Sequence, residues 1–192
     1  MAVCFIMDFD GGGADEYDAT LADMELGGEI PTGGLFHGAG ETETGWRVVD
    51  VWETAEQFEA FAQEKIGPLS AKNGFSEPRI ESFEVAQTRV GDDEPVTFLA
   101  VTKLPGVDAD RFAALNAAVM PDDELPEGVV YHVNGPLDDG WCVVGYWASK
   151  ELRDAFMTDV LAPAMQQAGA GTPPQIEDLP LHNSMHAASV TT

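Results

Sequence analysis

The sequence predicts an α+β protein that contains the same βαββαβ unit twice. Trp46 and Trp52 return 95 residues later as Trp141 and Trp147, within matching segments. The same offset aligns further pairs on both sides of these segments: Pro31 with Pro126, Gly40 with Gly135, Phe61 with Phe156 and Pro68 with Pro163. A repeat of this length indicates a duplicated domain rather than a short-period solenoid.

The first half starts with an expected strand and a short helix. Residues 3–9 form an apolar run that Asp10 and three glycines end, which is typical of a strand followed by a turn. Tyr17, Leu21 and Met24 then recur at spacing i, i+4, i+7, so one face of a helix is apolar.

A β-hairpin and a longer helix follow. Residues 34–39 and 45–52 are expected to pair around a turn at 41–44. Thr54 and Gln57 then have the spacing of a capping box, in which the threonine side chain accepts from the backbone N–H three residues on. Apolar residues at helical spacing follow, and residues 79–85 form the last strand of the unit.

The second half repeats this order. Strands are expected at 96–104, 129–133, 140–147 and 175–181, with a hairpin turn at 136–139. Phe112, Leu115 and Val119 mark the packing face of its first helix. We therefore expect repeats at 1–86 and 96–183, a polar linker at 87–95 and a flexible tail at 184–192.

The βαββαβ order is the ferredoxin-like arrangement, an antiparallel sheet with both helices on one face. This layout, with the hairpin sequences at 35–40 and 45–52, resembles the dimeric α/β-barrel superfamily, specifically antibiotic-biosynthesis-monooxygenase-like domains in tandem. The resemblance implies that the two repeats form an intramolecular pseudo-dimeric α/β barrel, which a further homodimer could extend. Members of the superfamily include cofactor-independent quinol and anthrone monooxygenases, haem-degrading enzymes and lactone isomerases.

Composition excludes several partners. The chain has 34 acidic and 9 basic residues, a net charge of −25, so a phosphate-binding surface for nucleic acid or anionic lipid is not expected. No apolar run approaches the ~20 residues of a membrane span, and the protein is expected to be soluble and cytoplasmic. Cys4 and Cys142 fall in predicted strands and are expected to be buried free thiols.

Strand alternation gathers the candidate site residues on one sheet face. His37 is expected to face Val48, with Trp46 and Asp50 as diagonal neighbours and Trp52 further along. The matching set in the second half is His132, Trp141, Gly145 and Trp147. We favour this face as the lining inside the barrel, with a helix-facing orientation as the alternative, and the missing side chain at Gly145 is expected to leave room for a ligand.

A histidine beside a carboxylate points to general-base chemistry. Asp50 would orient the His37 imidazole and raise its affinity for a proton, and His132 is the equivalent candidate in the second half. The predicted substrate-binding residues are aromatic: Trp46, Trp52, Tyr131, Trp141 and Trp147. Alternatively, the histidines make only structural hydrogen bonds and the tryptophans fill the core.

Other groups give weaker signals. Tyr17 could donate a hydrogen bond to a substrate, but it matches Phe112, so packing explains it equally well. His182 and His186 lie four residues apart without nearby ligands, so no metal site is predicted. No cofactor is expected, although the resemblance raises haem held by His37 or His132 as a further option.

The sequence thus favours an enzyme for a small apolar or aromatic molecule. The resemblance implies cofactor-independent oxygenation, or a proton-transfer isomerisation or cyclisation. The rival is a non-catalytic ligand-binding or stress-related barrel.

Overall fold

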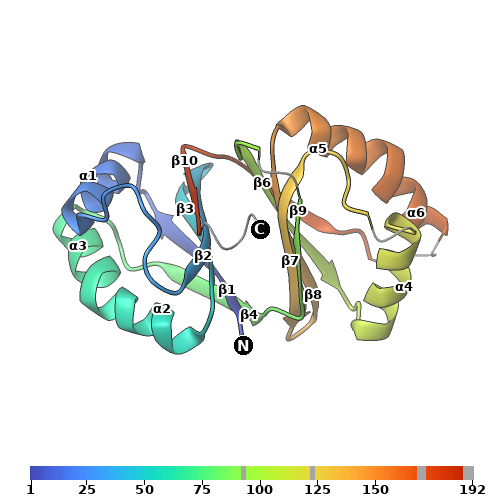
Figure 1. Ribbon diagram of the computed structural model, residues 1–192, viewed down its shortest axis with the longest axis horizontal. Coiled ribbons are helices and arrows are strands. Elements are labelled where there is room, and N and C mark those ends of the chain that lie inside the picture. The colour runs from blue at the N-terminus through green and yellow to red at the C-terminus, as the bar shows by residue number, and fades with distance from the viewer. Residues whose placement is uncertain (92–93, 122–123, 168–171, 188–192) are drawn as a thin grey trace. The chain divides into compact units, whose positions relative to one another are not determined.

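The computed structural model describes residues 1–91, 94–121, 124–167 and 172–187. The chain divides into two compact units (Figure 1). The first unit contains Met1–Glu84 and Leu179–Thr192, and the second contains Val85–Asp178. Both have the predicted βαββαβ order, so the expected α+β class with two ferredoxin-like repeats is confirmed.

The first unit has a five-stranded antiparallel sheet with strand order β10-β2-β3-β1-β4. Its strands are β1 (Val3–Asp10), β2 (Gly34–Thr42), β3 (Gly45–Trp52), β4 (Arg79–Glu84) and β10 (Asn183–His186). Its helical segments are α1 (Ala14–Met24), α2 (Ala55–Phe61), the π-helical η1 (Ala62–Ile66) and α3 (Gly67–Lys72).

The second unit repeats this arrangement with strand order β5-β7-β8-β6-β9. Its strands are β5 (Gln87–Val90), β6 (Phe98–Pro105), β7 (Val129–Leu137), β8 (Gly140–Trp147) and β9 (Gln175–Pro180). Its helical segments are α4 (Ala109–Val119), α5 (Lys150–Phe156), the π-helical η2 (Met157–Leu161) and α6 (Ala162–Gln167).

Two short strands correct the expected linker and tail. Residues 87–90 form β5 at the edge of the second sheet, and residues 183–186 form β10 at the edge of the first. Both pair antiparallel along an otherwise open edge, so backbone hydrogen bonds order segments whose side chains carry no strand pattern. Residues 92–93 of the expected linker and 188–192 of the expected tail lie outside the described residues.

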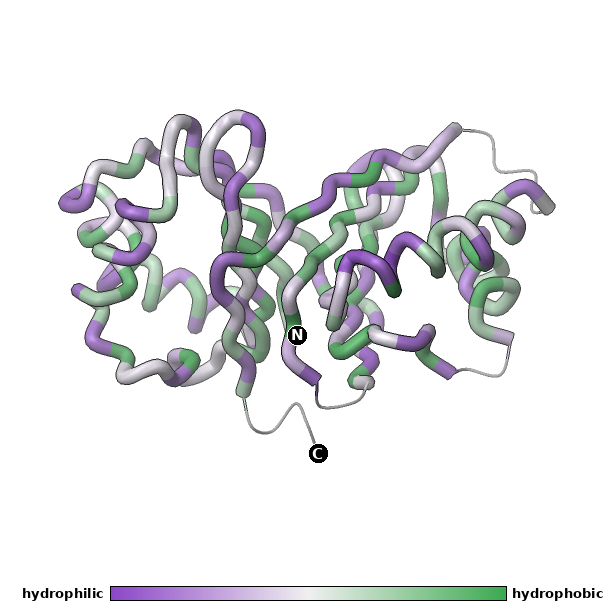
Figure 2. The backbone as a smooth tube through the Cα atoms, turned by 90° about the horizontal axis from the view of Figure 1, so that it is seen from above, coloured by the Kyte–Doolittle hydropathy of each residue, from purple (hydrophilic) through white to green (hydrophobic). Residues whose placement is uncertain are grey.

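Helices pack on one face of each sheet and create the core there. In the first unit, Phe5 of β1 stacks on Phe58 of α2 with ring centroids 3.8 Å apart. The capping box that begins α2 is confirmed, since Gln57 N donates to Thr54 Oγ1 at 3.2 Å. In Figure 2 hydrophobic stretches run along the strands, whereas the helices alternate between hydrophobic and hydrophilic residues. Among the described residues, no helix combines the length and apolar character needed to cross a membrane.

Candidate functional site

The face that carries the candidate residues lies beneath the helices of the first unit. Trp46, Val48 and Trp52 share one buried cluster with Tyr17 of α1 and Phe58 of α2. Trp52 meets the Phe58 ring edge-on at 5.8 Å. The preference for this face as the inner lining of a barrel is therefore wrong, and the helix-facing alternative is correct, because aromatic residues of β3 pack against aromatic residues of the helices.

The hairpin register also differs from the expected one. His37 pairs directly with Asp50, and Ala39 rather than His37 pairs with Val48, because β2 continues to Thr42 and leaves a tighter turn. The register is thus displaced by two residues, which keeps every side chain on its expected face. The displacement brings the carboxylate opposite the imidazole, with 2.7 Å between His37 Nδ1 and Asp50 Oδ1.

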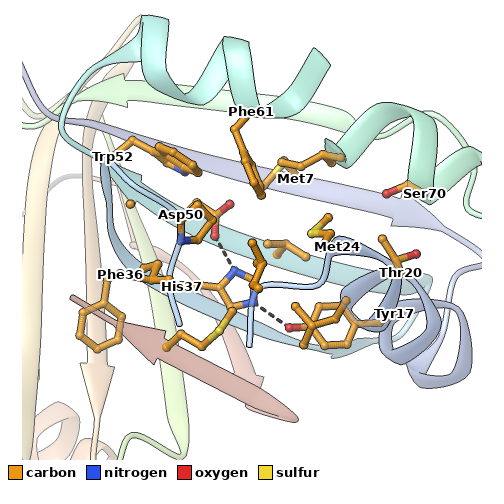
Figure 3. A pocket seen from close by; sticks show the side chains of 18 of the residues that line it. Met7, Tyr17, Thr20, Met24, Phe36, His37, Asp50, Trp52, Phe61 and Ser70 are labelled. Carbon is orange, nitrogen blue, oxygen red and sulfur yellow. Dashed lines mark hydrogen bonds and ion pairs between the residues drawn. The ribbon is translucent and has the colours of Figure 1, made fainter. Parts of the chain in front are cut away.

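A chain of hydrogen bonds extends from this pair to α1 and β10. Tyr17 Oη lies 2.8 Å from His37 Nε2, and Asn183 Nδ2 donates to Tyr17 Oη at 2.7 Å (Figure 3 draws the two contacts of His37). An amide nitrogen only donates, so the tyrosine hydroxyl directs its own proton to His37 Nε2. The imidazole then carries its proton on Nδ1, where it donates to Asp50. We call Asp50, His37 and Tyr17 the relay.

Burial controls the protonation of Tyr17. Desolvation raises the pKa of its phenol well above the ordinary value, the nearby Asp50 and Asp18 charges raise it further, and the hydrogen bond from Asn183 opposes them. The phenol therefore stays protonated at neutral pH. It can pass a proton along the relay only when it receives another at the same time.

The relay lines an apolar cavity of about 70 Å³ between the sheet and the helices. Its other walls are mainly apolar and include aromatic residues and methionines, among them Met7, Met24, Trp52 and Phe61 (Figure 3). Met185 of β10 also lines it. The volume is below the ~300 Å³ at which ligand pockets usually begin. Methionine side chains are flexible, so rotamer changes in this wall can enlarge the cavity for a ring-sized molecule.

The two tryptophans of β3 have different places. Trp52 lines the cavity. Trp46 packs behind Tyr17, with ring centroids 5.1 Å apart, and against the edge of His182 at 5.4 Å. Trp46 therefore supports the tyrosine of the relay.

The second unit pairs His132 directly with Gly145, where a diagonal position was expected, and it has no relay. Its α4 has Phe112 where α1 has Tyr17. Gly145 lines a cavity of the second unit, although the space nearest to it is taken by the indole of Trp147, whose Nε1 would lie 2.7 Å from a Cβ at this position. Burial lowers the pKa of His132 to about 4, and the positive charge of Arg89 lowers it further, so this imidazole is neutral at pH 7.

The remaining predicted aromatic residues divide between packing and a second cavity. Trp147 lines a cavity in the second unit together with His132. Trp141 stacks on Phe112 and donates its indole N–H to Asn134 Oδ1 at 3.1 Å. Tyr131 precedes His132 in β7 and points to the opposite face, where its ring lies 5.9 Å from that of Tyr146. Tyr131 lines neither of these two cavities.

Two residues of the site were missed or discounted at the level of sequence. Because Tyr17 matches Phe112, packing accounts for it equally well in the sequence, and no pattern in the sequence singles out Asn183. A signal was present, however: the repeats differ at Tyr17 and Phe112 and also at Asp50 and Gly145. Both polar partners of His37 are thus lost together in the second repeat.

The described residues contain no group of three or more His, Cys, Asp or Glu residues arranged to hold a metal ion. His182 Nε2 instead contacts Asp18 Oδ1 at 2.8 Å, and His186 stacks on Phe36 at 5.5 Å.

Comparisons with known proteins identify the fold. No family model and no curated protein matches the chain. A solved structure of a putative monooxygenase from Lactobacillus acidophilus superimposes with a TM-score of 0.72 at 13% identity, covering 96% of both chains. The chain shares its fold. This confirms the monooxygenase-like resemblance at the level of the fold, over nearly the whole sequence.

Two further structures have the same fold with different descriptions. An anthrone oxidase-like protein superimposes with a TM-score of 0.56 at 15% identity, covering 97% of this chain and 93% of that one. A heme-degrading enzyme from Listeria monocytogenes superimposes with a TM-score of 0.50 at 8% identity, covering 93% of this chain and 98% of that one. At these identities the likeness concerns the fold alone.

Proposed function

We propose that the first unit is an enzyme site that takes a proton from a small, largely apolar aromatic molecule and lets the resulting anion react with O₂. The observation that carries this proposal is the relay of Asp50, His37 and Tyr17 along the wall of an apolar cavity. The few polar groups in the wall of an apolar pocket fix the orientation of a ligand, and a titratable set of them can also act on it.

The relay moves one proton in a concerted way. The substrate donates to Tyr17 Oη while Tyr17 gives its own proton to His37 Nε2, and Asp50 stabilises the imidazolium that forms. The high pKa of Tyr17 prevents a phenolate from accumulating. His37 therefore acts on the substrate through Tyr17. The sequence alone had suggested that His37 would contact the substrate directly.

The oxygen step balances without a further reductant. For a ring CH₂ group that is activated by a carbonyl through the intervening aromatic rings, the carbanion transfers electrons to O₂ and one oxygen atom bonds to the carbon. The O–O bond then breaks, the second CH proton is lost, and the other oxygen leaves as water. The net change is CH₂ plus O₂ to C=O plus H₂O. Trp52 and Phe61 would hold the flat ring, and the descriptions of the putative monooxygenase and the anthrone oxidase-like protein favour this chemistry.

Haem does not fit this cavity. Both ring nitrogens of His37 already have partners, so neither is available as an axial ligand. The cavity of about 70 Å³ is lined by no lysine or arginine that could pair with propionate groups. We therefore derive no step through haem.

Two other functions are consistent with particular observations. The relay can return its proton to a different atom of the substrate, which would be an isomerisation or cyclisation without O₂. The cavity of about 70 Å³ leaves little room for a substrate and O₂ together, which favours binding of a small molecule without turnover. Measurements of proton exchange and oxygen uptake distinguish both from oxygenation.

Anthrone, whose CH₂ group lies between two aromatic rings, tests the proposal. As a molecule of three rings it enters the cavity of about 70 Å³ only if the flexible methionine side chains of the wall change rotamer. In anaerobic D₂O the wild-type protein should exchange the CH₂ protons, and with O₂ it should consume oxygen and form anthraquinone. Tyr17→Phe and Asp50→Asn should each lower both rates by about 10²-fold or more, the usual scale for loss of general-base catalysis. Tyr146→Phe, which removes a buried hydroxyl from β8 of the second unit, outside both cavities, is the matched control and should be unaffected.

The pattern of results decides among the functions. Exchange without oxygen uptake would indicate proton transfer alone, and binding with neither reaction would indicate a non-catalytic site. Equal rates in Tyr17→Phe and wild type would remove the relay from the mechanism.

A further inference from the structure

The second unit contains its own cavity, of about 80 Å³, at the place equivalent to the relay cavity. It is lined by apolar residues from the sheet and the helices, among them Leu115, Val143, Trp147 and Met157. The polar exceptions are Thr102, Asn116, His132 and Arg153. An apolar space with a few polar groups is the usual composition of a small-molecule site.

Two polar atoms of these lining residues are buried without a hydrogen-bond partner. They are Nδ1 of His132 and Nε of Arg153. Nearly all buried polar groups in proteins are paired, because an unpaired one loses its hydration without compensation. The unpaired nitrogens therefore point to a partner that enters the cavity.

The charges around the cavity indicate that this partner is neutral. Burial lowers the pKa of His132, so its imidazole is uncharged and offers one N–H and one lone pair. The Arg153 guanidinium is already balanced by ion pairs with Asp154, at 2.7 Å, and with Asp178. Because these two aspartates balance its charge, Arg153 offers no uncompensated positive charge to a carboxylate ligand, whereas a hydroxyl or carbonyl oxygen needs none.

The cavity lacks the two side chains that complete a relay with the histidine. Phe112 stands in place of the relay tyrosine, and Gly145 in place of the relay aspartate. A ligand there would be bound and not transformed.

We propose that the cavity of the second unit is a non-catalytic binding site for a small neutral molecule, mostly apolar, with one hydroxyl or carbonyl oxygen hydrogen-bonded to His132 Nδ1. A cavity of ~150 Å³ holds benzene, so the cavity of about 80 Å³ limits the ligand to a molecule of at most one six-membered ring. This site does not depend on the function proposed for the first unit.

Phenol and benzene are matched probes, because they share a ring and differ by one hydroxyl group. In full-length protein labelled with ¹³C-methyl methionine and ¹⁵N histidine, Met157 reports on the second cavity and Met185 on the first. Phenol should shift both the Met157 methyl signal and the ring ¹⁵N signals of His132. Benzene should shift Met157 with at least fivefold weaker affinity and leave the His132 nitrogens unchanged.

The variant His132→Leu removes the polar anchor and keeps an apolar wall. Its affinity for phenol, measured at Met157, should fall about tenfold to the level of benzene, whose own affinity should not fall. The proposal is overturned if saturating phenol leaves Met157 unmoved, as it would if the cavity held only water or if phenol bound solely near Met185. Equal affinities of phenol and benzene in the wild type would also overturn it, and this comparison decides the matter even if the variant fails to fold.

Discussion

At the scale of single residues, the partners of each histidine decide what it can do. His37 and His132 occupy equivalent positions, yet His37 has a carboxylate and a phenol as partners whereas Nδ1 of His132 has none. Sequence reasoning brought His37 and Asp50 together because strand alternation fixes which residues share a face. It could not find their direct pairing, because the turn length that sets the register depends on where β2 ends. The contact with Tyr17 depends on the packing of α1, which periodicity describes only as an apolar stripe.

The pKa of His132 predicts a pH dependence of stability. Burial lowers this pKa to about 4, against 6.5 for an exposed histidine, so between these pH values the unfolded chain binds more protons than the folded one. The free energy of unfolding should therefore fall as the pH drops from about 6.5 to 4, by up to about 3 kcal/mol from this residue. Above pH 7 the residue should have no such effect.

Urea denaturation of wild type and His132→Leu at pH 4, 5, 6 and 7 measures the contribution of His132 to the free energy of unfolding. The difference between the two proteins cancels most of the carboxylate titrations that both share. As the pH is lowered, the free energy of unfolding should fall more in the wild type than in His132→Leu. A difference that stays constant over this range would show that His132 titrates normally in the folded protein.

At the scale of elements, the last short strand completes a site built by the first repeat. Asn183 and Met185 are two residues apart in β10, so both face the helices, where one donates to Tyr17 and the other lines the cavity. The long strands and helices were predictable because their apolar periodicity is strong. β5 and β10 were not, because each has four largely polar residues and is ordered by pairing to a sheet edge.

Because Asn183 donates a hydrogen bond to Tyr17, replacing this donor by an acceptor should lower the reaction rate without weakening ligand binding. In Asn183→Asp a carboxylate would accept the tyrosine hydroxyl proton and draw it away from His37 Nε2. We expect the anthrone exchange rate to fall about tenfold or more with little change in ligand affinity, and the His37 ring ¹⁵N signals to report a changed tautomer. Asn183→Gln, which keeps a donor amide, should recover part of the rate. If Asp and Gln variants behave alike, Asn183 only packs in the wall.

At the scale of the whole molecule, duplication has kept the fold and changed polar side chains beneath the helices. Tyr17 and Asp50 of the first unit correspond to Phe112 and Gly145 of the second, while the strand order and even the π-helical segments η1 and η2 recur in both. Sheets and helices depend on apolar patterns that many substitutions preserve. A relay depends on three particular side chains, and loss of any one of them leaves the fold intact.

The strong negative charge of the chain predicts that salt stabilises it. With 34 acidic and 9 basic residues, like charges repel most strongly in the compact folded state. Raising the ionic strength from ~0.01 M to ~1 M shortens the screening length from ~30 Å to ~3 Å, so NaCl should raise the melting temperature of the full-length protein by several degrees. The double variant Glu59→Gln, Glu64→Gln removes two charges from exposed positions and should melt at a higher temperature at low salt, with a smaller rise on adding NaCl.

Sucrose at matched osmolality controls for solute effects other than screening, and the variant should respond to it as the wild type does. A melting temperature that is insensitive to NaCl would mean that the acidic residues are spaced widely enough, or paired well enough with the few basic ones, for their repulsion to be unimportant.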